Sequence, residues 1–340
     1  MTCQRARRLT KKSTNHLVGT VVDMRIRYSE PEPEIRFVTV DGIRLRTRNE
    51  GCGPPLLLIN GFGANLEVWD PLARLLRGRR LISFDAPGIG GSAPAPRRLR
   101  MPQLADIVGG LLDRLGVDSA DLLGYSFGGA VAQQLAHQNP QRVRRLILAA
   151  TIPGLGAVQR PSVVINLLDP RLRSAIGANR RQQQVARLVG GRSGADPDTL
   201  AVFERNRMLM PTAPSGYRSQ FQTLLGWSSI RWLHTITAPT LVLVGDEDPI
   251  VPMINSRLFT RLIPDCRRYV LRGAGHLFPL DQPEEIIGVI DSFLGTPAEP
   301  AGRRSRPTFR DSAVKVRTAA GRHLTRRRRA IDGDTAADVG

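Results

Sequence analysis

Hydrophobic residues recur along this chain in short, nearly continuous runs. The runs that have the length of a strand buried on both faces are residues 56–60, 80–84, 120–124, 145–149, 240–244 and 267–271. Ahead of them, residues 35–48 alternate apolar and polar positions on either side of Asp41-Gly42, a dipeptide that suits a two-residue hairpin turn. The pattern predicts an antiparallel hairpin followed by a sheet of buried strands.

Segments with helical spacing separate the buried runs. Apolar residues recur every three or four positions in residues 71–76, 102–116, 128–138 and 283–294. Alternation of helices with buried strands is typical of βαβ units, in which the strands are parallel and the helices cover the sheet. We therefore predict an α/β fold with a mostly parallel sheet.

One long stretch interrupts this alternation. Residues 152–237 carry helical patterns at 180–189 and 198–209 but no buried-strand run. An insertion of about 85 residues is too long for an ordinary loop, so we predict a helical cap. The cap would divide the core into residues 35–151 and 238–295. We expect residues 1–34 to be a flexible basic extension that ends in a linker, and residues 296–340 to be a disordered basic tail.

Positive charge is spread over the whole chain, whose formal net charge is +19. The densest cluster is the run of arginines at 326–329, in the tail. A basic tail attracts nucleic acid or anionic surfaces, so a basic surface- or nucleic-acid-binding protein is an alternative of a different class. No base-reading motif accompanies these arginines. The chain has no apolar run long enough for a transmembrane segment, and we expect it to be cytoplasmic.

The sequence G-Y-S-F-G places Ser126 between a predicted strand and a predicted helix. In that context G-x-S-x-G puts a serine on a sharp turn above the sheet, where it can act as a nucleophile. Small residues at Gly124 and Gly128 allow such a turn to close without a Cβ collision. We predict that Ser126 is a nucleophile rather than an ordinary turn residue.

A nucleophilic serine needs a base, and the base needs a carboxylate to orient it. Of the five histidines, His276 lies in the loop after the last predicted strand, at the sheet edge where α/β proteins assemble their sites. Asp248 follows the strand at 240–244 and precedes a proline, so we choose it as the acid, with Asp246 as the alternative. The chain order serine, acid, histidine is that of the α/β-hydrolase arrangement.

An oxyanion hole would complete this machinery. One donor comes from the residue after the nucleophile, which is Phe127. The second is expected from the loop after the strand at 56–60, where Gly61 and Gly63 would let the backbone direct the N–H of Phe62 into the site. The three cysteines never form C-x-x-C, so no thiolate metal site is predicted, and the chemistry needs no cofactor.

Several longer motifs occur together with these residues. They are "NGFGANLEVW", "FDAPGIGGS", "GYSFGGAVAQQLAH", "LGWSSIRWLHTITAPTLVLVGDEDPIVPMINSRLF" and "GAGHLF". Through them, residues 35–295 resemble the intracellular medium-chain-length poly(3-hydroxyalkanoate) depolymerases, which are α/β-hydrolases. The resemblance implies an α/β-hydrolase fold with an inserted helical cap, and it maps Ser126, Asp248 and His276 onto nucleophile, acid and base. The family typically has tryptophan where this chain has Phe127.

The expected function is therefore serine-dependent hydrolysis of esters through an acyl-enzyme. The resemblance implies poly(3-hydroxyalkanoate) or its oligomers as substrate, with a polyester granule surface as a partner. A lipid-like ester, cleaved by a generic lipase or esterase, is one alternative, and a C–C hydrolase or a cofactor-free haloperoxidase are others. Trp227 and Trp232 are candidates for the substrate pocket, although core packing of the cap explains them equally well.

Overall fold

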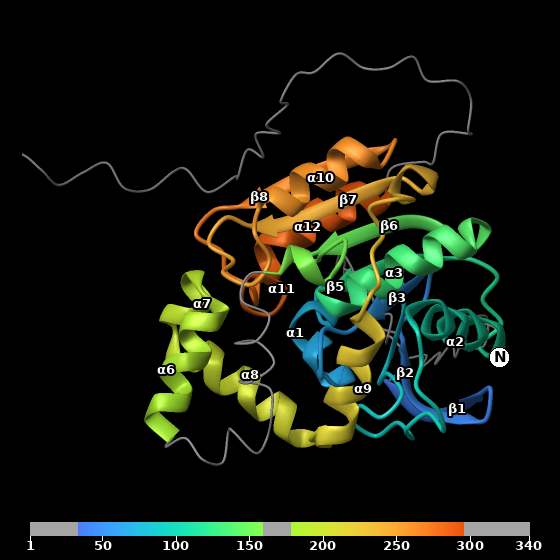
Figure 1. Cartoon of the computed structure of the whole chain (residues 1–340), viewed down its shortest axis with the longest axis horizontal. Coiled ribbons are helices and arrows are strands. Elements are labelled where there is room, and N and C mark those ends of the chain that lie inside the picture. Colours follow the sequence, from blue (N-terminus) through green and yellow to red (C-terminus); the bar gives the residue numbers. More distant parts are fainter. Residues whose placement is uncertain (1–32, 159–177, 296–340) are drawn as a thin grey trace, which may run out of the picture. The chain divides into compact units, whose positions relative to one another are not determined.

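The structure is a computed structural model that describes residues 33–158 and 178–295. Its centre is an eight-stranded sheet in the order β1-β2-β4-β3-β5-β6-β7-β8 (Figure 1). The hairpin is antiparallel, β2 also pairs antiparallel with β4, and every other pair is parallel. The strands are β1 (Glu34–Val40), β2 (Ile43–Glu50), β3 (Pro55–Ile59), β4 (Arg80–Phe84), β5 (Ala120–Tyr125), β6 (Val143–Ala149), β7 (Thr240–Gly245) and β8 (Cys266–Leu271).

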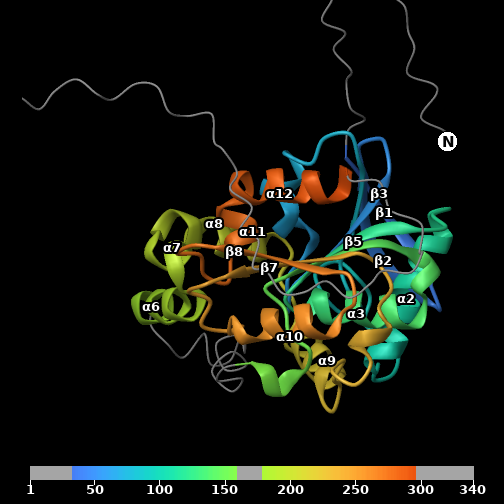
Figure 2. The same ribbon diagram turned by 90° about the horizontal axis from the view of Figure 1, so that it is seen from above.

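Helices cover both faces of this sheet (Figure 2). One buried cluster joins the strands to α2 (Met101–Arg114), α3 (Phe127–Gln138) and α10 (Ile254–Leu262). A second cluster lies on the opposite face, against α1 (Asp70–Ala73), α11 (Phe278–Asp281) and α12 (Pro283–Gly295). Short 3-10 turns are η2 (Leu66–Trp69), η3 (Pro140–Arg142), η4 (Leu155–Ala157) and η5 (Leu233–Thr235). The predicted α/β class, with a mostly parallel sheet covered by helices, is confirmed.

Two details of the core differ from the sequence pattern. The helix expected at 71–76 already ends at Ala73. Helix α10 was not predicted, and its buried residues are of mixed character. Two of them, Asn255 and Ser256, are polar, and only Phe259 is a large apolar side chain. Phe259 and the partly buried Leu262 nevertheless form a short apolar face against the sheet, so α10 is amphipathic although it also buries polar residues.

Helices also occupy the described part of the long insertion between β6 and β7 (Figure 1). They are α6 (Ala178–Val189), α7 (Gly191–Ala195), α8 (Pro197–Leu209) and α9 (Pro214–Leu224). Asp196 is the N-cap of helix α8, and its carboxylate accepts hydrogen bonds from the backbone N–H groups of Asp198 and Thr199. We refer to α6–α9 as the cap.

Several predictions fall on residues that the structure does not describe. The extension at 1–32, part of the insertion at 159–177, and the tail at 296–340 with its arginines lie outside the described residues. Within residues 33–158 and 178–295, no helix has both the length and the apolar character that crossing a bilayer requires.

Candidate active site

Ser126 occupies the sharp turn between β5 and α3. Its backbone angles, φ 52° and ψ −115°, fall in a region that residues other than glycine rarely adopt. Hydrogen bonds on both sides hold this conformation: Ser126 N–H donates to the Ala149 carbonyl (2.9 Å), and the Thr151 hydroxyl donates to the Ser126 carbonyl (2.6 Å). At Gly128, a Cβ atom would overlap the carbonyl oxygen of Ile59. The turn therefore depends on close backbone packing that only glycine permits.

The structure brings the predicted acid, base and nucleophile together. His276 Nδ1 lies 2.7 Å from Asp248 Oδ2, and His276 Nε2 lies 3.1 Å from Ser126 Oγ. Because a carboxylate can only accept, Nδ1 must carry the proton, which leaves Nε2 free to accept from the serine hydroxyl. Asp248 and His276 are 8% and 7% exposed, so their hydrogen bond is shielded from solvent.

Hydrogen bonds separate the roles of the two candidate carboxylates. Asp248 Oδ1 accepts from the backbone N–H groups of Ile250 (2.8 Å) and Val251 (2.9 Å), which fixes the carboxylate and leaves Oδ2 for His276. Asp246 instead accepts from the N–H of Gly273 (2.7 Å) and pairs with the exposed Arg272 (3.3 Å). Asp246, the alternative acid, thus braces the loop that carries the histidine and does not contact the histidine itself.

The cap fixes the histidine loop in place. His276 N–H donates to the carbonyl of Val189 at the end of α6 (2.7 Å), and the Tyr125 hydroxyl donates to the His276 carbonyl (3.1 Å). Next to that contact, Gly191 has φ +55°, and a Cβ atom there would overlap the backbone nitrogen of Gly275. The cap therefore contributes to the position of the base as well as covering the site.

The cap also holds the loop that was predicted to donate to an oxyanion. The N–H of Gly63, which has φ +64°, donates to Gln220 Oε1 on α9 (2.6 Å), and the Tyr217 ring fills the space where a Cβ of Gly63 would be. Among the described residues, none accepts a hydrogen bond from the N–H of Phe62 or of Phe127. The rings of these two phenylalanines meet edge to face, 6.2 Å apart.

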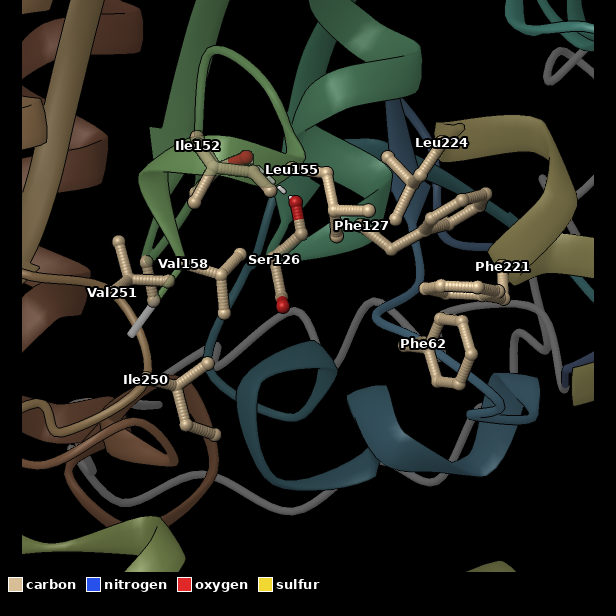
Figure 3. A pocket seen from close by; sticks show the side chains of 12 residues that line it. Phe62, Ser126, Phe127, Ile152, Leu155, Val158, Phe221, Leu224, Ile250 and Val251 are labelled. Carbon is tan, nitrogen blue, oxygen red and sulfur yellow. Dashed lines mark hydrogen bonds between the residues drawn. The ribbon is translucent and has the colours of Figure 1, made fainter. Parts of the chain in front are cut away.

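One cavity beside Ser126 is almost wholly apolar, and we call it the apolar cavity (Figure 3). Its lining contains no charged side chain, and besides Ser126 its one polar side chain is that of Thr151. Figure 3 shows the rings of Phe62, Phe127 and Phe221 on one side of Ser126 together with Leu224, and Ile152, Val158, Ile250 and Val251 on the other. The aliphatic residues are Ile152, Leu155, Val158, Leu224, Ile250 and Val251.

A second cavity lies against the cap, and we call it the histidine cavity because His276 lines it. It shares Ser126, Phe62 and Ile250 with the apolar cavity. Unlike the apolar cavity, it contains charged side chains, Glu204 and Arg207 of α8. Ser126 therefore stands where an apolar space and a partly charged space meet.

Comparisons with known proteins identify the family of this chain. Residues 54–283 match the model of the α/β hydrolase fold family. The chain belongs to the α/β-hydrolase family. This hydrolase is 37% identical, over 82% of its length and 98% of the relative's, to a poly(3-hydroxyalkanoate) depolymerase of Ectopseudomonas oleovorans. It is an enzyme of the ester-hydrolase class.

Other relatives of this hydrolase span its described core. It is 28% identical to a 2-hydroxymuconate semialdehyde hydrolase of Pseudomonas sp. strain CF600, over 77% of this chain and 94% of the relative. A solved hydrolase structure from Pseudomonas aeruginosa PA01 matches with a TM-score of 0.65 and 31% identity, covering 77% of this chain and 98% of that one.

The two tryptophans predicted for the substrate pocket lie elsewhere in this hydrolase. Trp227 donates from its indole N–H to Gln134 Oε1 of α3 (2.7 Å), and Trp232 stacks on His137 of the same helix, with ring centroids 4.3 Å apart. Neither lines the apolar cavity or the histidine cavity. They pack the returning chain onto the core, which is the alternative explanation for their apolar character.

Several residues around the site were missed by sequence reasoning. Gln220 and Tyr217 support the Phe62 loop, Arg207 enters the histidine cavity, and Thr151 braces the nucleophile. Gln220 and the residue it contacts are 157 positions apart, so no local motif links them. Tyr125, whose hydroxyl donates to the His276 carbonyl, could have been found from the sequence, because it directly precedes Ser126. Among the described residues, no cluster of histidine, cysteine or acidic side chains could hold a metal ion.

Proposed function

We propose that this hydrolase cleaves the ester bonds of poly(3-hydroxyalkanoate) or its oligomers, with Ser126 as nucleophile. One observation carries the proposal: the hydrogen-bonded series from Asp248 through His276 to Ser126 opens onto a cavity lined almost wholly by apolar side chains. A hydroxyalkanoate unit has both parts that this arrangement suits, an ester carbonyl and an alkyl side chain. The similarity to a poly(3-hydroxyalkanoate) depolymerase supports the same substrate class.

In the first half of the reaction, Ser126 Oγ attacks the ester carbonyl carbon while His276 Nε2 takes the hydroxyl proton. The carbonyl oxygen becomes an oxyanion, which the N–H groups of Phe62 and Phe127 stabilise. The carbon–oxygen bond to the leaving unit then breaks. His276 gives its proton to the departing oxygen, which becomes the hydroxyl group of the released fragment. Asp248 stabilises the imidazolium that exists between these two transfers.

In the second half, water hydrolyses the acyl-enzyme by the same route. His276 takes a proton from the water as its oxygen attacks the carbonyl carbon of the acyl group. The bond to Ser126 Oγ breaks, and the proton on His276 passes to the serine. The products are a carboxylic acid and the resting enzyme, so the cycle needs no cofactor.

The apolar cavity explains a preference for alkyl-bearing acyl units. Each methylene group that enters it from water contributes about 0.8 kcal/mol. Its lining offers a carboxylate or hydroxyl almost no polar partner, because the Thr151 hydroxyl already donates to the Ser126 carbonyl. The acyl side chain is therefore expected to lie among Leu155, Ile152 and Leu224.

Hydrolysis of 4-nitrophenyl esters of graded chain length, with poly(3-hydroxyoctanoate) as the polymer, tests this function. We expect turnover to rise from the acetate to the octanoate, the polymer to be degraded, and a fluorophosphonate to label Ser126. A generic esterase would cleave short esters and leave the polymer intact, and that result would replace the proposal.

A C–C bond hydrolase is the second candidate, because a 2-hydroxymuconate semialdehyde hydrolase is among the relatives of this chain. That chemistry would use the same triad but would break a carbon–carbon bond. Incubation with 2-hydroxymuconate semialdehyde separates the two activities: we expect no consumption of this compound under conditions in which the octanoate ester is cleaved.

A further inference from the structure

The histidine cavity contains one basic side chain whose charge the hydrolytic machinery does not use. Of the described residues that line it, Arg207 of α8 is the only lysine or arginine. Arg207 forms no ion pair with any residue in the described ranges 33–158 and 178–295. A cation in a cavity beside Ser126 that pairs with none of the described acidic side chains is suited to an anionic group of the substrate.

Aromatic contacts hold Arg207 at the edge of this cavity. Its guanidinium donates to the Tyr217 hydroxyl and lies 5.4 Å from the Phe203 ring centroid and 5.6 Å from that of Tyr217. Its Nε is buried and has no hydrogen-bond partner among the described residues. Tyr217 also packs on the Phe62 loop, with ring centroids 5.9 Å apart. The charge is therefore fixed relative to the groups that surround Ser126.

The order of the reaction assigns this cavity to the leaving unit. His276 gives its proton to the departing oxygen, so the leaving unit departs on the side that His276 lines, which is the histidine cavity. In a polyester of 3-hydroxy acids, the leaving side of each ester runs toward the free carboxylate of the chain. When the last ester bond is cleaved, the leaving unit is a single hydroxy acid that carries this carboxylate.

Resting on the function proposed above, we propose that Arg207 binds the free carboxylate of the leaving hydroxy acid. The enzyme would then prefer the last ester bond at the carboxyl end of a chain and release one hydroxy acid at each step. Arg207 is a specificity-determining residue in this account and takes no part in bond breaking. Its hydrogen bonds to the carboxylate are charge-assisted, the strongest kind that a side chain can form here.

Several acidic side chains lie near Arg207 and would repel a carboxylate bound anywhere else in this region. Glu204 lines the same cavity and already has an interaction partner. A neighbouring groove shares Phe203 and Arg207 with the histidine cavity, and Asp196, Asp198 and Glu284 line it. A carboxylate that passed beyond Arg207 would meet these like charges. Arg207 is thus the favourable end point for an anionic leaving unit.

Hydrolysis of the linear dimer of 3-hydroxyoctanoic acid, as the free acid and as its methyl ester, tests the proposal. We expect the unmodified enzyme to prefer the free acid by about tenfold or more in kcat/KM, the size of a charge-assisted hydrogen bond. Arg207→Gln should remove this preference through KM and leave the methyl ester within about twofold. Arg207→Lys should restore part of the preference.

Two further variants serve as controls. Arg205→Gln removes a positive charge from an exposed position on the same helix and should leave the preference intact. Glu204→Gln removes the nearby negative charge and should strengthen the preference. Equal rates for the two dimers with the unmodified enzyme, or an unchanged preference in Arg207→Gln, would overturn the role of Arg207. If neither dimer nor the octanoyl 4-nitrophenyl ester is cleaved, the proposed function itself fails instead.

Discussion

The two cavities that meet at Ser126 differ in chemistry and in origin. The apolar cavity is formed by segments that follow core strands, such as Ile152 after β6 and Ile250 after β7, together with Phe221 and Leu224 of the cap helix α9. The histidine cavity adds cap residues, among them the charged side chains Glu204 and Arg207. In the function proposed above, the core loops and α9 receive the acyl side chain, and Arg207 of α8 selects the leaving unit.

The largest expected effect concerns Ser126, one of the three residues that line both cavities. Ser126→Ala should lower kcat by about 10⁶-fold on every ester, because the nucleophile and base act as a unit. Burst kinetics with 4-nitrophenyl octanoate should disappear, while the thermal midpoint should stay close to that of the unmodified enzyme. Retained turnover of either a short or a long ester would show that another nucleophile serves one of the cavities.

The next largest effect distinguishes the two carboxylates after β7. Asp248→Asn should lower kcat by about 10⁴-fold, because an amide can hold the imidazole in the wrong tautomer. Asp246→Asn is the matched control, since it changes a carboxylate that contacts Gly273 and Arg272 instead of the histidine. We expect it to cost less than about tenfold. Comparable losses in the two variants would contradict the assignment of the acid.

A smaller effect should follow from loosening the contact between cap and histidine loop. Gly191→Ala places a methyl group against the Gly275 backbone at a positive φ, so we expect kcat to fall by about 10- to 100-fold and the thermal midpoint to drop. Gly288→Ala is the control, because nothing lies within 4 Å of a Cβ at that helical position. If Gly191→Ala behaves like the control, the cap does not position the base.

The smallest effect concerns chain length. Leu155 is a half-buried residue of the apolar cavity, and Leu155→Trp should fill part of that space. We expect kcat/KM for the octanoyl ester to fall about tenfold while the butyryl ester changes little, because a few methylene groups lose their burial. Steady-state kinetics on the ester series measures this. Equal losses on both esters would mean that the acyl chain lies elsewhere.

Sequence patterns predicted most of the core and the proximity of Ser126, Asp248 and His276, because both depend on local signals. Strands β5 and β7 are continuous buried runs, and Ser126 and Asp248 follow them closely. His276 follows β8, an edge strand in which only Leu271 is buried, so the expectation that residues 267–271 are buried on both faces was wrong. Parallel strands bring those positions to one edge of the sheet. Strand β6 lies between β5 and β7, so the loops after β7 and β8 have to bring Asp248 and His276 across to Ser126. In the structure, His276 is hydrogen-bonded to both Asp248 and Ser126, as the α/β-hydrolase order of the three residues along the chain predicts.

The existence of a helical cap could be predicted, but its contacts with the candidate site could not, because they join segments that are distant in the sequence. The hydrogen bond from Gly63 to Gln220 and the placement of Tyr217 over the same loop have no sequence pattern. Trp227 and Trp232 were interpreted as pocket residues because a large apolar side chain in an insertion suits a pocket and a packing contact equally. In the structure both contact α3. Only the three-dimensional contacts separate these cases.

The central claim is that Ser126 holds an ester between an apolar acyl side and a histidine-lined leaving side. A crystal structure of the enzyme after reaction with 4-nitrophenyl octylphosphonate tests it most directly. We predict phosphorus bonded to Ser126 Oγ, a phosphoryl oxygen on the N–H groups of Phe62 and Phe127, and the octyl chain beside Leu155 and Leu224. An octyl chain that instead lies in the histidine cavity next to Arg207 would contradict the account.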